Sequence, residues 1–138
     1  MVNAQMLHLR GAVALGAATA TRGAPEAPSL LRVAERAADH LLRSRIVRFR
    51  PTGLLLRAGI HAARGDRTGA GALLQAAARG FDTAEMSLYA AAARRRHAEM
   101  IGGASREADL RAADDCMTQE SIRDPARFTR MLAPGFDR

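Results

Sequence analysis

The chain has no lysine and no tryptophan, and it has only one cysteine and five aromatic residues among 138 positions. Without lysine it lacks the side chain that contacts the nucleotide phosphates in protein kinases and in P-loop ATPases, which excludes both of these sites. The lone cysteine, Cys116, excludes an internal disulfide and a zinc finger and is typical of a reducing compartment. The scarcity of aromatic and β-branched residues argues against a β-sandwich or a β-barrel.

Alanine and arginine are the residues that the chain has in excess. It contains 31 alanines, and all 21 of its basic residues are arginines. Both are strong helix formers, so the composition predicts an all-α protein. Because alanine buries little area, the helices have to approach closely to form a stable core. A length of 138 residues corresponds to one domain.

The charge of the chain is strongly positive. The formal net charge is +7 and the sequence pI is about 11.4, so nucleic acid, acidic protein surfaces and anionic lipid come into consideration as partners. A GC-rich genome also favours arginine codons over lysine codons, so this excess of arginine can arise without any selection for phosphate contacts. The charge alone is therefore weak evidence for nucleic-acid binding.

The N-terminal residues form either a helix or a weak secretory signal. Arg10 precedes a short apolar run, and residues 18–20 (ATA) resemble a signal-peptidase site. Only Val13 and Leu15 in this run are large, whereas apolar residues recur here at helical spacing. The members of this stripe are Val2, Met6, Leu9, Val13, Ala17 and Ala20. We expect a structural helix over residues 2–21 and no membrane span, because no run approaches ~20 apolar residues.

Proline and glycine divide the following residues into two further helices. Residues 22–28 contain two prolines and a glycine, which end the first helix, and Ser29 is the expected N-cap of the second. Pro51 disfavours helical geometry at Arg50, so the third helix is expected at residues 53–64 with Thr52 as its cap. This third helix is apolar on most sides, and we expect it to be the most buried.

Capping signals set the remaining helices. Asp82 and Glu85 have the spacing of a capping box, in which the side chain of each residue hydrogen-bonds to the backbone amide of the other. This capping box predicts a fifth helix at residues 83–101. The other expected caps and stops are Asp66 or Thr68 for the fourth helix, Gly102-Gly103 after the fifth, Ser105 for a sixth at residues 106–119, and Asp124-Pro125 for a short last helix. Together these elements predict a stack of antiparallel helical hairpins.

Residues 54–77 contain the best internal pattern. In tetratricopeptide repeats, small residues stand where the two helices of a hairpin cross, because only a short side chain permits that approach. The positions that match this spacing are Leu54, Ala58, Gly65, Ala70, Leu74 and Ala77. Arg57 stands where a large apolar residue is usual, and residues 83–119 fit the template poorly.

Two continuous segments carry a family resemblance. They are RGFDTAEMSLYAAAARRR at residues 79–96 and SIRDPARFTRMLAPGF at residues 121–136. Together they resemble the extreme C-terminal, tetratricopeptide-like helical-repeat region of large bacterial serine/threonine protein kinases and related multidomain signalling ATPases. The resemblance covers about residues 53–136 and is vague before that. In those proteins this region follows the catalytic domain and is thought to bind partners or to restrain the catalytic part.

The resemblance does not carry kinase activity to this chain. There is no Gly-rich loop, no His-Arg-Asp catalytic loop, no Asp-Phe-Gly and no Walker-type motif. We therefore expect a terminal part or a stand-alone remnant of such an array, without enzymatic activity. No catalytic, cofactor-binding or metal-binding residue and no small-molecule substrate is predicted.

The residues that could carry chemistry are scattered. His8, His40, His61 and His97 stand on different expected helices, so a metal site would require them to converge in the fold. Asp114 and Asp115 are adjacent and point about 100° apart on a helix, which suits a solvated surface.

Two arginine clusters remain as candidate partner or anion contacts. They are Arg43, Arg45, Arg48 and Arg50 at the end of the second helix, and Arg94, Arg95 and Arg96 in the fifth. Three consecutive residues cover about 200° of a helix, so at least one of the second cluster lies near the inner edge, where an acid such as Glu107 or Asp114 is a suitable partner. Few aromatic residues stand near either cluster for base stacking.

The sequence thus predicts one all-α helical-repeat domain over residues 1–138, with an N-terminal hairpin of uncertain type at residues 1–50 and the family-like repeats at residues 53–136. The expected function is non-catalytic protein–protein interaction, or self-association through an exposed apolar side of the first helix, in the cytoplasm of a bacterium as part of a signalling system. A small basic nucleic-acid-associated helical protein is the alternative.

Overall fold

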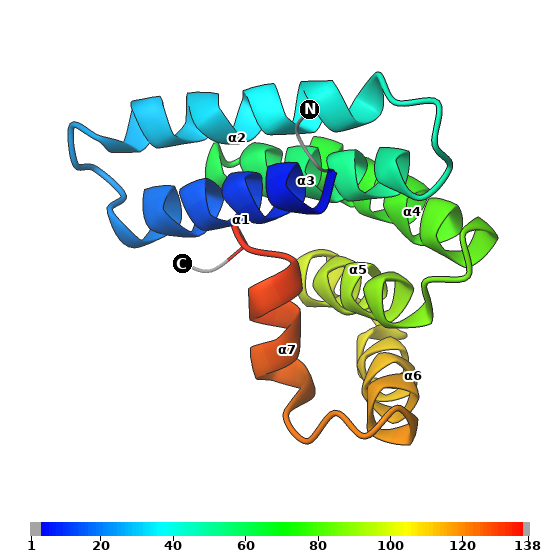
Figure 1. Cartoon of the computed structure of the whole chain (residues 1–138). Helices are drawn as coiled ribbons and strands as arrows, with labels where there is room; N and C mark the ends of the chain where they lie inside the picture. Colours follow the sequence, from blue (N-terminus) through cyan, green and yellow to red (C-terminus); the bar gives the residue numbers. More distant parts are fainter. Residues whose placement is uncertain (1–3, 137–138) are drawn as a thin grey trace.

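The computed structural model describes residues 4–136 and contains seven α-helices and no strand in that range, which confirms the all-α prediction. The helices are α1 (Ala4–Ala20), α2 (Ala27–Leu42), α3 (Phe49–Ala63), α4 (Arg67–Thr83), α5 (Ser87–Ile101), α6 (Arg106–Gln119) and α7 (Pro125–Leu132). They occupy most of the chain between short connections (Figure 1).

The first six helices form a stack of antiparallel hairpins. Each helix packs against the next, and α1 also contacts α3, as in a helical-repeat arrangement. Figure 1 shows α1, α2 and α3 lying across the view, with α5 and α6 turned nearer to end-on, so the direction of the helices rotates along the stack. The expected tetratricopeptide-like architecture is confirmed at the level of this arrangement.

Small residues let the helices approach closely. Ala34, Ala38 and Ala58 are fully buried, and at Gly11 of α1 an added Cβ would lie 2.7 Å from Leu56 of α3. At Gly53 of α3 it would lie 3.0 Å from the backbone oxygen of Ala38 in α2. Side chains larger than alanine at such crossings would push the helices apart, so the alanine-rich composition and the close stacking belong together.

The turn after α3 has the same hydrogen bonds as the turn after α4. The N–H groups of Gly65 and Asp66 donate to the carbonyls of Ala62 and His61, at 3.0 and 2.8 Å, which is a Schellman motif with Gly65 at φ 85°. Asp66 then caps α4 by accepting from the N–H of Gly69 at 2.9 Å, so one of its two expected caps is confirmed.

The capping box expected at Asp82 and Glu85 is wrong. Helix α4 continues to Thr83, and Asp82 lies inside it and accepts two hydrogen bonds from Arg94 of α5. Glu85 has a positive φ of 58° and occupies the position after α4 that Gly65 occupies after α3. Helix α5 begins only at Ser87. A guanidinium offers a carboxylate two charge-assisted bonds, which outcompete the single amide of a capping box.

The expected starts of α2 and α3 are also wrong. Helix α2 begins at Ala27, with Ser29 inside its first turn, and α3 begins at Phe49, with Pro51 inside its first turn. Proline is tolerated there because the first N–H groups of a helix have no intrahelical partner to lose. The hydroxyl of Thr52 donates to the carbonyl of Phe49 at 2.6 Å and does not cap the helix.

The helix boundaries near the C-terminus agree better with those expected from the sequence. Gly102 ends α5 with φ 69°, and Asp124 caps α7 by accepting from the N–H of Arg127 at 3.1 Å, with Pro125 following it. Helix α6 spans the expected residues, although Ser105 at its N-cap makes no side-chain capping bond.

The apolar stripe expected on the first helix faces outward. Met6, Leu9 and Val13 are each more than half exposed, and α1 packs into the stack through Leu15 and its small neighbours. Val2, the first member of the stripe, lies outside the described residues. The expectation that α1 presents an exposed apolar side is confirmed.

The segment after α7 returns to the centre of the stack. Figure 1 shows this segment running from α7 up to α1, beside α5. Its glycine, Gly135, packs so closely on the backbone of Gly59 in α3 that an added Cβ would lie 2.6 Å from the Gly59 oxygen. From α5, buried Arg96 donates through Nε to the carbonyl of Ala133 at 2.9 Å and lies 5.2 Å from the ring centre of Phe136. The segment thereby ties α3 to α5.

We predict opposite effects for two Gly→Ala substitutions that both face this segment. At Gly59 a Cβ would lie 2.5 Å from Leu15 and also clash with the Pro134 carbonyl, so Gly59→Ala lowers the free energy of unfolding by roughly 1–3 kcal/mol. At Gly16 the nearest atom is 3.8 Å away, so Gly16→Ala raises it by about 0.5–1 kcal/mol through helix propensity. Urea denaturation of both variants checks this, and equal effects would contradict the described packing.

Candidate functional site

An open groove of about 1280 Å³ lies on the surface of the described part of the chain. Four segments that are far apart in the sequence form its walls: α1, the α2–α3 connection with the start of α3, the α4–α5 turn with α5, and α7. The lining residues are His8, Leu9, Ala12, Ile46, Val47, Arg48, Phe49, Thr52, Thr83, Ala84, Glu85, Met86, Tyr89, Met131 and Leu132. We refer to this site as the apolar groove.

Large apolar side chains are exposed along the apolar groove. Leu9 is 57% exposed, Ile46 51%, Val47 59% and Met131 64%, and these are four of the seven exposed large hydrophobic residues in the described range. Scattered exposed apolar residues are normal, but a contiguous set around one hollow marks an interaction surface.

The α2–α3 connection holds two of these side chains outward. The N–H of Ile46 donates to the hydroxyl of Ser44 at 3.1 Å, and the N–H of Phe49 donates to the carbonyl of Ile46 at 3.1 Å. This turn sends the half-buried Phe49 against the core of the first three helices, while Ile46 and Val47 stay in solvent.

Aromatic rings form the inner part of the apolar groove. The ring of His8 meets Tyr89 edge-on with 5.9 Å between ring centres, and Tyr89 lies 5.2 Å from the ring of Phe81. Burial lowers the pKa of His8, whose Nδ1 has no hydrogen-bond partner among residues 4–136, and raises the pKa of Tyr89. Both rings are therefore neutral at pH 7, and this part of the apolar groove carries no charge.

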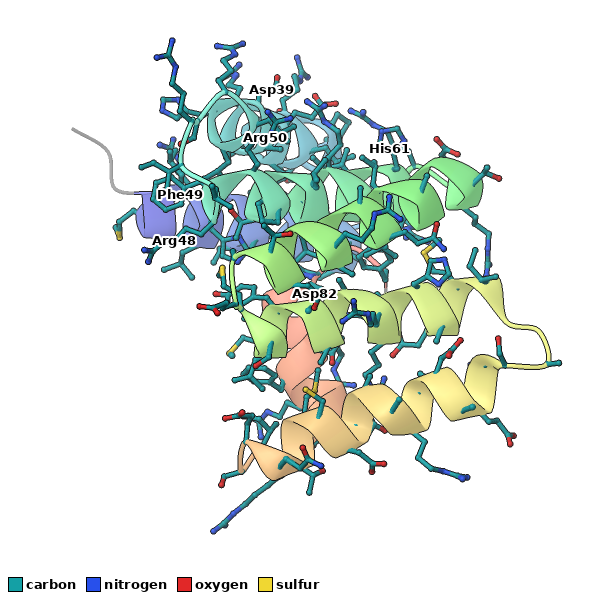
Figure 2. All side chains as sticks on the ribbon, turned by 90° about the vertical axis from the view of Figure 1, so that its right-hand side faces the viewer. Asp39, Arg48, Phe49, Arg50, His61 and Asp82 are labelled. Carbon is teal, nitrogen blue, oxygen red and sulfur yellow. The ribbon has the colours of Figure 1, made fainter. Side chains whose placement is uncertain are left out.

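The first arginine cluster stands beside the apolar groove. Arg48 lines it; Arg43 and Arg45 belong to the same α2–α3 connection, and Arg50 lies in the first turn of α3. All four side chains are exposed, and none makes an ion pair or a hydrogen bond with another side chain described between residues 4 and 136. Figure 2 shows Arg48 and Phe49 beside α1 and Arg50 nearer to α2. These four arginines are thus available to an anionic partner.

The second arginine cluster lies on α5, and its side chains contact other residues of the chain. Arg94 pairs with Asp82, and this guanidinium lowers the pKa of the Asp82 carboxyl. Arg95 pairs with Asp114 of α6 at 2.7 Å, as expected for an inner arginine of this cluster. Arg96 is buried and contacts the C-terminal segment. The structure does not bring the two clusters together into one basic surface.

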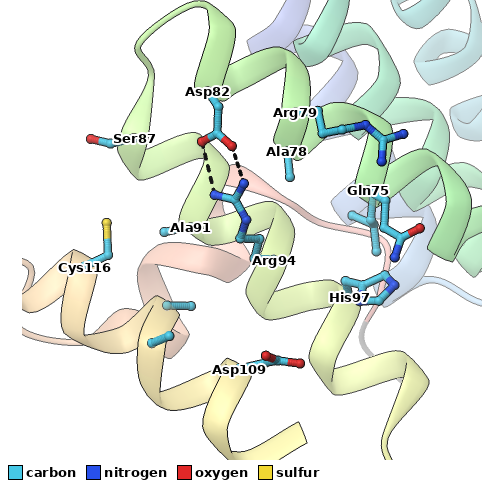
Figure 3. Close-up of a pocket in the computed structure, with 13 residues that line it drawn as sticks. Gln75, Ala78, Arg79, Asp82, Ser87, Ala91, Arg94, His97, Asp109 and Cys116 are labelled. Carbon is cyan, nitrogen blue, oxygen red and sulfur yellow. Dashed lines mark hydrogen bonds and ion pairs between the residues drawn. The ribbon is translucent and has the colours of Figure 1, made fainter. Parts of the chain in front are cut away.

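A smaller hollow of about 610 Å³ lies between α4, α5 and α6 (Figure 3). The Asp82–Arg94 pair stands at its wall, so these opposite charges neutralise one another there. Cys116 and His97 both line the hollow and lie at opposite ends of it in Figure 3. None of the large hydrophobic residues that are exposed in the described range lines this hollow, in contrast to the apolar groove.

The histidines do not converge. His8, His40, His61 and His97 belong to four different helices, and His61 instead contacts the capping Asp66 at 2.8 Å. Within residues 4–136, no group of three or more His, Cys, Asp and Glu side chains is arranged to hold a metal ion. No described helix has both the length and the apolar character needed to cross a membrane.

Comparison with known proteins gives no relative: no family model, no curated protein and no solved structure matches the chain.

Sequence reasoning anticipated parts of two walls of the apolar groove, the exposed apolar side of α1 with Leu9 and the arginines around Arg48, and missed the others. The run of arginines around Arg48 was visible in the sequence. Ile46 and Val47 were missed, although two β-branched residues between arginines outside any helix are a signal of exposed apolar surface. The contribution of Met131 had no local signal, because the path of the chain after α6 brings α7 to this wall.

We predict that burial of His8 makes stability depend on pH below neutrality. The folded-state pKa of His8 lies below its ordinary value of 6.5, so the unfolded chain takes up this proton first as the pH falls. The His8 contribution to the free energy of unfolding is therefore complete above about pH 7.5 and declines as the pH falls through about 6.5. Denaturant melts at several pH values check this. The variant His8→Phe should lack this part of the decline, and an unchanged slope would contradict the buried neutral ring.

Proposed function

We propose that the chain is a non-catalytic protein–protein interaction module. The observation that carries this proposal is the apolar groove, with four large apolar side chains more than half exposed around a hollow of about 1280 Å³. Exposed apolar surface of this kind is costly in water and is stabilised when a partner covers it. Small-molecule sites are typically about 300–1000 Å³ and far more enclosed, so a polypeptide partner fits the apolar groove better.

The wider setting of the proposal comes from the sequence resemblance. We place the module in a bacterial signalling system, in the cytoplasm, related to the terminal part of kinase-associated helical-repeat arrays. The single cysteine and the two segments at residues 79–96 and 121–136 support this setting. In such an arrangement the chain contributes binding, and a different chain or domain contributes the chemistry.

A nucleic-acid-associated function is the second candidate, favoured by the net charge of +7 and by the four exposed arginines of the first cluster. Base stacking would need exposed aromatic rings among these arginines. Phe49, the aromatic residue among them, is half-buried against the core of the first three helices. The side chains between the arginines, Ile46 and Val47, are apolar and suit a protein surface.

Salt dependence separates the two candidates. We predict that size-exclusion chromatography with light scattering gives the same mass for the protein with and without a short duplex DNA at moderate salt. Phosphate contacts release counterions, so a DNA complex would weaken steeply as salt rises, whereas an apolar contact would not. A DNA complex at low salt that dissociates with added salt would overturn the proposed function in favour of the second candidate.

A further inference from the structure

Helices and turns form the walls of the apolar groove. Some N–H groups of these turns already donate within the chain, as in the bonds from Phe49 to Ile46 at 3.1 Å and from Met86 to Phe81 at 2.9 Å. The structure describes no strand in residues 4–136, so there is no sheet edge for an extended peptide to join. A peptide that enters apolar surroundings must then satisfy its own backbone, and an α-helix does so.

The charge around the apolar groove is uneven. Arg48 lines the groove, and Arg45 and Arg50 stand within three residues of Arg48 in the chain, all exposed and without an ion pair in the described part of the chain. Glu85 is the acidic residue among the lining residues. Carboxylates on an occupant would meet several guanidiniums on the α2–α3 side, whereas basic residues there would be repelled.

A second copy of this chain is a poor occupant. A two-fold dimer built on this surface would bring a second exposed arginine cluster into the same interface. Each subunit also carries a net charge of +7, which adds long-range repulsion. The complementary partner has to bring negative charge beside its apolar side chains.

We propose that the apolar groove binds an acidic amphipathic helix of a partner protein. The apolar face of this helix, with side chains at i, i+3, i+4 and i+7, packs on Leu9, Val47 and Met131. Its Asp and Glu residues lie along the flank that faces Arg45 and Arg48. This inference rests on the proposed function and names the class of its partner.

The probe for the test is a fluorescein-labelled peptide of about 16 residues with leucines at that spacing and glutamates elsewhere. Two control peptides keep the length and the helical pattern: one replaces the glutamates with arginines, and the other replaces the leucines with serines. Fluorescence anisotropy against the full chain, at low and at moderate salt, gives the three dissociation constants. Only the acidic amphipathic peptide is expected to bind tightly.

Substitutions in the chain locate the site. Arg48→Gln should weaken binding of the acidic peptide about two- to fivefold at low salt, the effect of one exposed ion pair. Val47→Ser should weaken it roughly tenfold through lost apolar burial, whereas Glu85→Gln should strengthen it about twofold. Arg22→Gln is the matched control, because Arg22 is an exposed arginine in the α1–α2 connection, which joins α2 at the end opposite to the α2–α3 connection (Figure 1). It should leave binding unchanged. Circular dichroism of each variant verifies that it folds.

The outcomes distinguish failure of this inference from failure of the proposed function. Equal binding of the arginine peptide, with the same sensitivity to Val47→Ser, would overturn the acidic partner and leave the interaction module standing. A dimer of the chain that Val47→Ser dissociates, without peptide binding, would make a second copy the occupant and overturn the inference. Absence of binding by every peptide, together with a salt-sensitive DNA complex, would overturn both proposals.

Discussion

Close approach of helix backbones is the constraint on which this structure depends. Alanine supplies much of the core, so the helices gain enough burial only where small residues let them come together, as Gly11 does against Leu56. The same principle operates at the end of the chain, where Gly59 and Gly135 meet backbone to backbone. Arg96 adds a charged donor to the Ala133 carbonyl at that place, and α3, α5 and the C-terminal segment are held as one unit.

The placement of α7 follows from that contact and shapes the functional surface. Because the C-terminal segment is held against α3 and α5, α7 cannot continue the stack and instead forms a wall of the apolar groove with Met131. The arginines divide accordingly. Those on α5 hold helices and the C-terminal segment together within the chain, and those of the α2–α3 connection remain exposed beside apolar side chains.

Composition and local signals predicted the class of fold but only part of the site. The helix count, the cap at Asp66 and the start of α7 at Pro125 follow from residues adjacent in sequence, where short-range physics decides. The start of α5 could not be predicted, because the carboxylate of Asp82 accepts hydrogen bonds from Arg94, twelve residues away, and does not cap α5. The apolar groove could not be predicted either, because its four walls meet only through the path of the whole chain.

Hydrogen exchange of the full chain, with and without the acidic amphipathic peptide, tests the central claim most directly. If an acidic helix fills the apolar groove, exchange slows in the α2–α3 connection at residues 44–49 and around the α4–α5 turn at residues 83–89, and it stays unchanged in α6 at residues 106–119. Slower exchange confined to the hollow between α4, α5 and α6, or no change at residues 44–49, would contradict the account.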